Sequence, residues 1–392
     1  MFSFGEPDAI LDGFDRLVIC ARIADSRLYK CILIFKLVMS VAGLLLLYYE
    51  YHKKKKLQCI IHPNVLIILN CIRAFCAMLL ITYIVIHGND LYRYSKTVII
   101  ITERMNKAYV FAVLRMFASV ATVGILISLA ILAVEQILST LSLSDYENVA
   151  RPRFILFITM SLTIIASCIA FCLMFTDTAF NADQIISSTA NSRNGLGYRL
   201  FLIFDLSLAF IVFCLCIIIK AWNTHLFINV RRKILCSAQQ RHQLSIKFQI
   251  NENLKIAKLF IPISFFTFLL YVINIFGTWA ANQFIRDTVL RLCVNELVFL
   301  HSWSAHVFAL CGLYQMGELP FIHSYTVRNG SEIVTMESTK QFHDRQKAMF
   351  EGPSDLPLLT HVPHTSLWPF PWICTFQQSR TQSPSTVQSF RV

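Results

Sequence analysis

Long apolar stretches alternate with shorter polar segments along most of this chain. An α-helix rises about 1.5 Å per residue, so about twenty apolar residues are enough to cross roughly 30 Å of hydrocarbon. In these stretches the apolar residues occupy all faces of the expected helix, which indicates that lipid surrounds part of each one. The pattern predicts an all-α membrane protein, a seven-transmembrane helix bundle. The seven spans lie near Cys31–Tyr49, Cys59–His87, Ala108–Glu135, Phe154–Thr176, Leu200–Lys220, Ile256–Ala280 and Leu292–Met316.

Composition supports this architecture. Hydrophobic residues make up 56% of the 392 residues and charged residues only 15%, well below the roughly one quarter of a soluble domain. The formal net charge of +12 has a simple explanation in a membrane protein, because Lys and Arg accumulate near anionic lipid on the cytoplasmic side. We therefore expect no nucleic-acid partner.

The thirteen cysteines are scattered, mostly within the apolar stretches. The closest pairs, Cys168 with Cys172 and Cys214 with Cys216, have no His or acidic residue beside them. Thiols in such places usually act as small buried hydrophobic groups. The sequence predicts neither a disulfide framework nor a metal site, and it indicates no cofactor.

Basic residues set the orientation of the bundle, although they divide equally between the two sets of loops. The four consecutive lysines Lys53–Lys56 directly follow the first span, where orientation is usually decided. We therefore predict an outside N-terminus and an inside C-terminus. The sequon at Asn329 then lies in the cytosol and is expected to stay unmodified.

These assignments divide the chain into three parts. Residues 1–30 form an extracellular segment that carries no cleaved signal peptide, and residues 31–316 form the bundle. Residues 317–392 are rich in Ser, Thr, Pro and His, which is typical of a mostly disordered cytoplasmic tail.

The connector between the fifth and sixth spans is basic and contains neither Gly nor Pro, so both flanking helices are expected to extend into the cytosol. Its end, LSIKFQINENLK, resembles the segment before the sixth helix of nematode serpentine chemoreceptors. The matching residues are Leu244, Ser245, Lys247, Gln249, Glu252 and Asn253. The run VEQ at the end of the third span, the loop SDYENVARPRF and His62-Pro63-Asn64 are similar to the class epsilon receptors of that group.

This resemblance implies a receptor that signals to a heterotrimeric G protein through its inner loops. Glu135 is followed by Gln136, whereas the family pattern has Arg there, and the departure puts the strength of coupling in doubt. The residues that the resemblance assigns to coupling are Glu135, Asp145, Tyr146, Glu147, Arg231, Arg232, Lys233, Gln249, Glu252 and Asn253.

Charged side chains within the spans are costly in lipid and should face the bundle interior or an aqueous cavity. We predict that Arg115 pairs with Asp205 or Glu296 at the floor of an outward-facing ligand cavity, and a purely structural ion pair is an equal alternative. The candidate ligand-binding residues are Arg115, Asp205, Tyr271, Asn274, Asn295 and Glu296.

Four other polar residues of the spans have separate expectations. Lys36 is expected to extend to the lipid headgroups, and Arg73 to join Asn70 in an internal polar network. His301 and His306 are expected to be hydrogen-bonded bundle residues rather than ligands.

No catalytic motif is present, so we do not expect an enzyme. The favoured function is a chemosensory receptor for an external small molecule, located in the cell membrane and expected in a sensory cilium. A ligand-gated cation channel of the insect chemoreceptor type is the main alternative, but the last span lacks the ending typical of that class. A transporter comes third, because no internal repeat is visible.

Overall fold

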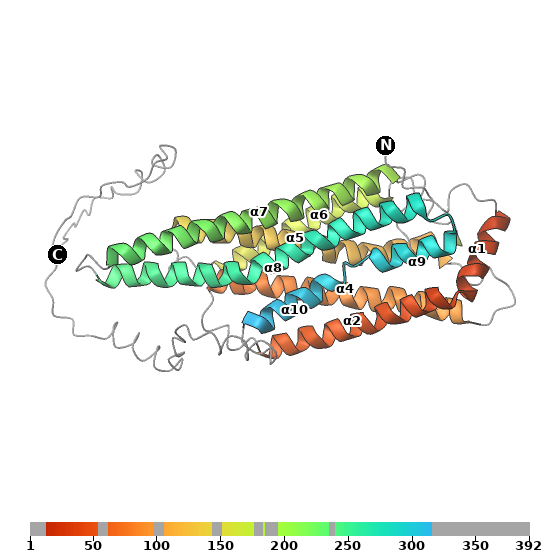
Figure 1. The fold of residues 1–392 in the computed structure, drawn as a ribbon, viewed down its shortest axis with the longest axis horizontal. Helices are drawn as coiled ribbons and strands as arrows, with labels where there is room; N and C mark the ends of the chain where they lie inside the picture. Colours follow the sequence, from red (N-terminus) through yellow and green to blue (C-terminus); the bar gives the residue numbers. More distant parts are fainter. Residues whose placement is uncertain are drawn as a thin grey trace, which may run out of the picture. The chain divides into compact units, whose positions relative to one another are not determined.

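The computed structural model describes residues 13–53, 62–96, 106–142, 151–175, 183–184, 195–234 and 240–315. All of them belong to one unit, Met1–Tyr325, and a second unit, Thr326–Val392, lies outside the described residues, as does the predicted tail. Figure 1 shows the helices of the first unit side by side in a bundle. The helices are α1 (Gly13–Asp25), α2 (Arg27–Lys53), α4 (Pro63–Ser95), α5 (Ala108–Leu141), α6 (Pro152–Phe175), α7 (Gly195–Ile234), α8 (Gln240–Phe284), α9 (Thr288–Val298) and α10 (Trp303–Gln315).

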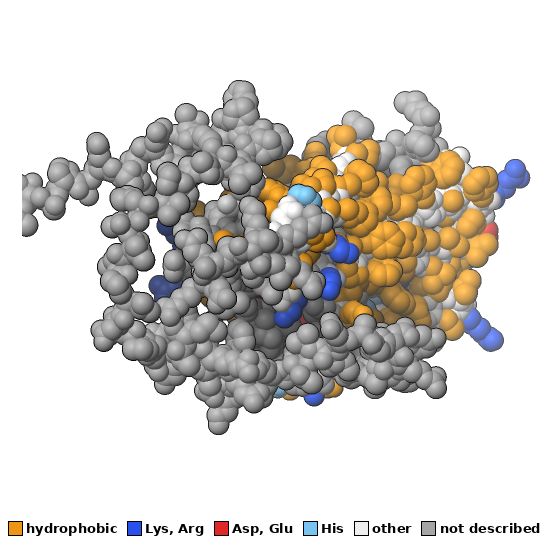
Figure 2. All heavy atoms as spheres, turned by 60° about the vertical axis from the view of Figure 1, so that its left-hand side comes forward, with side chains coloured by type: hydrophobic (Ala, Val, Ile, Leu, Met, Phe, Trp, Pro, Cys, Tyr) orange, Lys and Arg blue, Asp and Glu red, His pale blue; other side chains and the backbone are white. Residues whose placement is uncertain are grey.

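Seven spans of the described chain are long and apolar enough to cross a membrane, which confirms the predicted seven-transmembrane architecture. They correspond to α2, α4, α5, α6, α7, α8 and the pair α9 and α10. Large hydrophobic side chains are exposed along them, among them Leu45 (65%) and Phe157 (68%). Figure 2 shows a broad hydrophobic area on one face of the bundle, with Lys and Arg side chains near its margins. This is the surface that a helix bundle presents to lipid.

Helix α4 lies at the centre of the bundle. In its most hydrophobic 18-residue stretch 61% is buried, against 28% in the corresponding stretches of α2 and α6. His62 caps its first turn by accepting a hydrogen bond from the Asn64 N–H at 3.3 Å, and Pro63 follows at the first helical position. Proline is favoured there because its missing N–H would have no intrahelical partner. The principal hydrophobic core lies between α4 and helices α2, α5, α6, α7, α8 and α10.

The element boundaries agree with the sequence prediction in one place and differ from it in others. The connector without Gly or Pro predicted long inner extensions of the fifth and sixth spans, and α7 indeed continues to Ile234 while α8 begins at Gln240. A two-residue antiparallel pairing, Asn106–Lys107 with Asp183–Gln184, joins the segments before α5 and before α7. The seventh span is not one helix, because α9 ends at Val298 and α10 begins at Trp303.

Helix α1 was not predicted, since its segment is too polar to read as a span. Cys20, Ile23 and Ala24 are each at most 1% exposed and pack in one cluster with Tyr29, Tyr94 and Cys293. Their spacing of three and four residues is the signal of an amphipathic helix. In Figure 1, α1 lies across the end of the bundle next to α9.

Candidate functional site

Two buried polar regions lie at opposite ends of the bundle, and most of the described candidate residues belong to one of them. The region nearer α1 is called the outer half here, because the predicted orientation places that end outside the cell. The other region surrounds the start of α4.

The outer half contains a buried ion pair between α2 and α9. The Lys36 Nζ atom donates to a Glu296 carboxylate oxygen at 2.7 Å, and the two side chains are 9% and 15% exposed. The prediction that Lys36 extends to the headgroups is therefore wrong. The buried Lys36 charge is held by a neighbouring acid, which the sequence alone could not identify because 260 positions separate the two residues.

Arg115 lies next to this pair. Its guanidinium carbon is 5.4 Å from the centre of the Phe299 ring, and the Lys36 Nζ atom is 5.6 Å from the same ring. Both distances are within the range of a cation–π contact. Arg115 also interacts electrostatically with Glu296, so the structure places it in the neighbourhood that the sequence predicted for it.

Phe299 belongs to the break between α9 and α10. The backbone groups of the break have partners: the Phe299 N–H donates to the Asn295 carbonyl at 3.2 Å, and the Trp303 N–H donates to the Leu300 carbonyl at 2.9 Å. The Ser304 hydroxyl donates to the His301 carbonyl at 2.7 Å. Irregular backbone at membrane depth is tolerated when protein surrounds and satisfies it.

His301, in the same break, lies between the Lys36–Glu296 pair and a second group of polar residues on α7 and α8. One of its ring nitrogens lies 2.7 Å from the Asn274 amide nitrogen, and its ring is 4.8 Å from that of Tyr271. The Tyr271 hydroxyl donates a long hydrogen bond of 3.5 Å to Asp205. The structure thus brings together Asp205, Tyr271 and Asn274, all three of them predicted.

The expected pair between Arg115 and Asp205 does not form. Asp205 lies on α7 against α8, where Tyr271 is its hydrogen-bond partner among the described residues, while Arg115 lies over Phe299. Asn295 is also separate from the cluster, since its amide donates to Asn282 on α8 at 3.4 Å. His301 and His306 are hydrogen-bonded as predicted, the latter to the Met39 carbonyl at 3.0 Å.

A small cavity of about 10 Å³ lies beside this cluster, enough for about one water molecule. Its walls are Thr122, Ile125, Leu126, Thr267, Leu270, Tyr271, His301 and Ser304. This cavity is much smaller than a typical small-molecule site.

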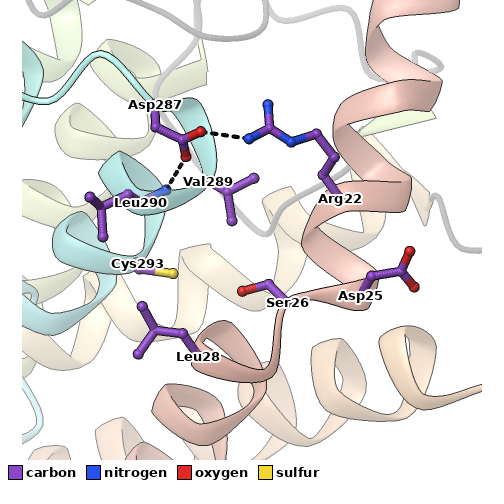
Figure 3. Close-up of a pocket in the computed structure, with 8 residues that line it drawn as sticks. All are labelled: Arg22, Asp25, Ser26, Leu28, Asp287, Val289, Leu290 and Cys293. Carbon is purple, nitrogen blue, oxygen red and sulfur yellow. Dashed lines mark hydrogen bonds and ion pairs between the residues drawn. The ribbon is translucent and has the colours of Figure 1, made fainter.

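A larger pocket of about 410 Å³ lies at the outer end, between α1 and the start of α9, within the volume range of small-molecule sites. The sequence did not indicate it, because α1 itself was missed. Figure 3 shows Arg22 of α1 extending to Asp287, at 2.5 Å, above Ser26 and Cys293. The hydrogen bond from the Leu290 N–H, and then the Arg22 guanidinium, lower the pKa of Asp287 below its usual value.

The inner region is a hydrogen-bond network at the start of α4. The Asn64 side-chain amide donates to Glu135 at 2.7 Å, and its oxygen accepts from the Arg151 N–H at 2.8 Å. The His62 N–H donates to Glu252 at 2.6 Å. These bonds connect α4 with α5, with the start of α6 and with α8, and we call His62, Asn64, Glu135 and Glu252 the inner latch.

A second set of bonds extends the network toward α7. The Ser139 hydroxyl donates to Asn253 at 3.0 Å, and the Thr140 hydroxyl and the Asn223 amide lie within 3.2 Å of each other. Asn253 also approaches Thr140 at 3.4 Å. Sequence analysis named Asn64 only for its resemblance to the family and missed Ser139, Thr140 and Asn223, since isolated Ser, Thr and Asn residues in apolar helices carry no distinctive pattern.

Gln136 is 4% exposed, and neither polar atom of its side chain has a partner among the described residues. It lines an apolar cavity of about 10 Å³ between α5, α7 and α8. Where the family pattern has Arg, this chain has a buried Gln136, and Glu135 accepts a hydrogen bond from Asn64.

The other predicted coupling residues divide as follows. Gln249, at 1% exposure, is buried near the inner end of α8. Arg231, Arg232 and Lys233 belong to α7, but their side chains lie outside the described part. Asp145, Tyr146 and Glu147 lie outside it altogether.

Arg73 forms a further buried ion pair with Glu50, with two bonds of 2.6 and 2.8 Å, and also bonds Asn70 at 3.0 Å, as its predicted network requires. Within the described ranges no group of His, Cys, Asp or Glu is arranged to hold a metal ion. Ten cysteines of those ranges are free thiols.

Comparison with known proteins identifies the family. The model of the serpentine type 7TM GPCR receptor class ab chemoreceptors matches residues 17–292, which include α2 to α8 and the beginning of α9. No curated protein matches the chain. The match confirms a serpentine chemoreceptor and gives no support to the cation channel, but it does not confirm class epsilon. The chain belongs to the class ab family of serpentine seven-transmembrane chemoreceptors, and it is a multi-pass membrane protein with a chemosensory function.

Proposed function

We propose that this receptor takes an external small molecule into the outer half of its bundle and signals to a heterotrimeric G protein through its inner end. The N-terminus is outside, and the protein acts in the cell membrane, with the sensory cilium as the expected place. The observation that carries the proposal is the buried network at the inner end. The inner latch contains Glu135 and Glu252, and the adjoining set of bonds contains Asn253, all three of them predicted to take part in coupling.

The latch provides a resting state that can open. Glu135 and Glu252 are 6% and 8% exposed, and their carboxylates accept hydrogen bonds from Asn64 and from the His62 N–H on the same turn of α4. Bonds to a carboxylate are stronger than bonds between neutral groups, and each is worth about 1.5–3 kcal/mol. A displacement of α5 and α8 away from the start of α4 breaks the bonds of Glu135 and Glu252 and exposes a polar surface on the cytosolic side.

The absent Arg after Glu135 is compatible with this mechanism. In the proposed resting state Asn64 takes the place of the Arg. Its side chain donates a hydrogen bond to Glu135 and accepts one from the Arg151 N–H. We therefore expect a receptor that couples although the Arg is absent.

The experiment measures signalling without any ligand. The receptor and an Asn64→Ala variant are expressed in cultured cells with biosensors for each class of Gα subunit. We expect Asn64→Ala to raise basal G-protein activation about tenfold, since it removes a bond of roughly 1.5 kcal/mol from the resting state. Asn89→Ala is the matched control, because Asn89 lies at the opposite end of the same helix, and its amide nitrogen has no partner among the described residues.

Surface expression of all variants is measured with an N-terminal tag on intact cells, which also tests the orientation. A tag that antibodies reach only after permeabilisation contradicts the outside N-terminus. The coupling proposal is wrong if Asn64→Ala reaches the surface at normal levels but activates no Gα class above the level of Asn89→Ala.

A further inference from the structure

Asp205 is a buried carboxyl group that the fold leaves half satisfied. It is 1% exposed, it receives the long bond from Tyr271, and its second oxygen has no hydrogen-bond partner among the described residues. Burying a carboxylate without a cation or a full set of donors is costly, and more so at membrane depth. A ligand that supplies the missing donor and a positive charge would offset this cost.

The other buried acid near the candidate ligand residues is already paired. Glu296 has Lys36 at 2.7 Å, whereas no Lys, Arg or His side chain of the described residues forms an ion pair with Asp205. The outer half therefore offers one buried carboxyl group that forms no ion pair within the described residues.

We propose that the ligand is an external amine and that Asp205 binds its ammonium group. The inference rests on the proposed function and adds the chemical class of the ligand. An ammonium group carries a positive charge and several N–H donors, which match the unsatisfied Asp205 oxygen, the Tyr271 hydroxyl oxygen and the face of the Tyr271 ring. The His301–Asn274 pair lies directly beyond that ring.

The surroundings define the rest of the ligand. Tyr271 packs in a cluster with Leu126 and Ala209, and Leu206 and Phe268 border it. These walls are apolar and suit a compact alkyl or aryl group. An alcohol would leave the charge of Asp205 without a counter-ion, and a carboxylate would be repelled by it.

Binding an amine here requires the helices to move. The adjoining cavity of about 10 Å³ holds about one water molecule. An amine with an alkyl chain therefore enters only if α8 separates from α7 or α5. Asp205 lies on α7 and Tyr271 on α8. An amine bound between them shifts the bundle toward the state in which α8 has moved, because a ligand favours the conformation that it binds more tightly.

The test is a thermal unfolding assay on the purified full-length receptor in lipid nanodiscs. The probes are hexylamine, 1-hexanol and hexanoate, which share a six-carbon chain and differ in the polar group. We expect hexylamine to raise the unfolding temperature saturably and to bind at least about tenfold more tightly than either other probe. Asp205→Asn keeps the shape of the side chain and removes its charge, so its affinity for hexylamine should fall about 30-fold or more, the usual loss when one partner of a buried charged pair is removed.

Two further variants keep the result interpretable. Asp90→Asn makes the same chemical change at a buried outer carboxyl on α4 that bonds Arg93 at 2.7 Å. It should lower the unfolding temperature, because Arg93 loses a buried partner, but it should leave hexylamine affinity within about twofold of wild type. Asp205→Leu suits the apolar surroundings, and it should unfold at or above the wild-type temperature without responding to hexylamine. If Asp205→Asn does not fold, Asp205→Leu provides the comparison.

The inference is overturned if hexanol or hexanoate stabilises the receptor as well as hexylamine does. It is also overturned if the Asp205 variants keep their response, or if hexylamine gives no saturable shift at any concentration that the nanodiscs withstand. None of these results depends on G-protein activation. A receptor that activates a Gα subunit through the opened latch but does not bind amines would disprove the amine inference and leave the proposed function standing.

Discussion

The Lys36–Glu296 pair makes a quantitative prediction about stability. With the Nζ atom 2.7 Å from the carboxylate oxygen, the attraction is about 6 kcal/mol at an effective dielectric constant of about 20. Removing the two ions from water costs several kcal/mol each, so the intact pair contributes little net stability. Loss of one partner is different, because the other charge stays buried without its counter-ion.

We therefore expect Glu296→Gln and Lys36→Met each to lower the free energy of unfolding by about 3–5 kcal/mol. The double variant Lys36→Met/Glu296→Leu removes both charges of the pair while Arg115 keeps its contact with the Phe299 ring, and it should unfold within about 1–2 kcal/mol of wild type. The charge-reversed pair Lys36→Glu/Glu296→Lys should recover part of the loss. Unfolding is followed by titration with a denaturing detergent in mixed micelles, and surface expression is measured in parallel.

The coupling energy between Lys36 and Glu296 is the change in unfolding free energy of the double variant minus the sum of the changes of the two single variants. If both single variants lose less than about 1 kcal/mol of unfolding free energy, the charges are solvated in the native protein. That result would contradict the structure, in which the two side chains are only 9% and 15% exposed. If the apolar double variant is as unstable as the single ones, packing rather than charge pairing decides stability at this site.

Two other predictions concern close packing and pH. A Cβ atom on Gly124 would lie 2.6 Å from the Phe75 ring, whereas one on Gly88 would meet nothing within 4 Å. In the same titration Gly124→Ala should therefore destabilise by about 1–3 kcal/mol, and Gly88→Ala should gain up to about 1 kcal/mol; equal effects would contradict the packing of α4 against α5. The pKa of Asp287 is lowered from its usual value of 3.8, so its bond to Arg22 stabilises the contact between α1 and α9 fully above about pH 3.8. This stabilisation is lost as the pH falls through the lowered pKa. Hydrogen exchange in α1 should accelerate over that acid range in wild type and be pH-independent in Asp287→Asn after correction for intrinsic rates, and an unchanged wild-type profile would show that the pair does not hold α1.

The spans were predictable because lipid imposes a single demand on all of them. A run of about twenty apolar residues is specified by local composition alone, whichever helices it packs against. The histidine prediction succeeded for a related reason, since a polar group inside a bundle has to find a partner. The sequence does not show which partner it finds, and Lys36 illustrates this, because its acid lies 260 positions away.

The break in the seventh span escaped prediction for a different reason. Phe299–Ser302 contain neither Gly nor Pro, so nothing local signals an interruption. The break is stabilised by tertiary contacts instead: Phe299 packs near Lys36 and Arg115, and His301 is bound to Asn274. These contacts exist only after the helices have assembled.

Helix α8 connects the two polar regions and offers a physical route between them. Tyr271 and Asn274 bond groups of the outer half, and Glu252 and Asn253 bond groups of the inner network. Nineteen residues, about 28 Å of helix, separate Glu252 from Tyr271.

The helix is not uniform over that length, because Pro262 lies between the two groups. A proline removes one intrahelical hydrogen bond and makes bending easier at that place. A ligand that separates α8 from α7 near Tyr271 therefore has two ways to affect Glu252: a rigid tilt of α8 or a change of its bend at Pro262.

The two routes differ in one measurable respect. If α8 tilts as a rigid body, Pro262→Ala leaves ligand-dependent opening of the inner latch intact, because a straighter helix transmits a tilt equally well. If the bend changes, the same variant keeps ligand affinity but loses the link between ligand and latch. Since coupling is a free energy shared by two sites and must act in both directions, Asn64→Ala should raise ligand affinity in wild-type α8, and under the second route it should not do so in Pro262→Ala.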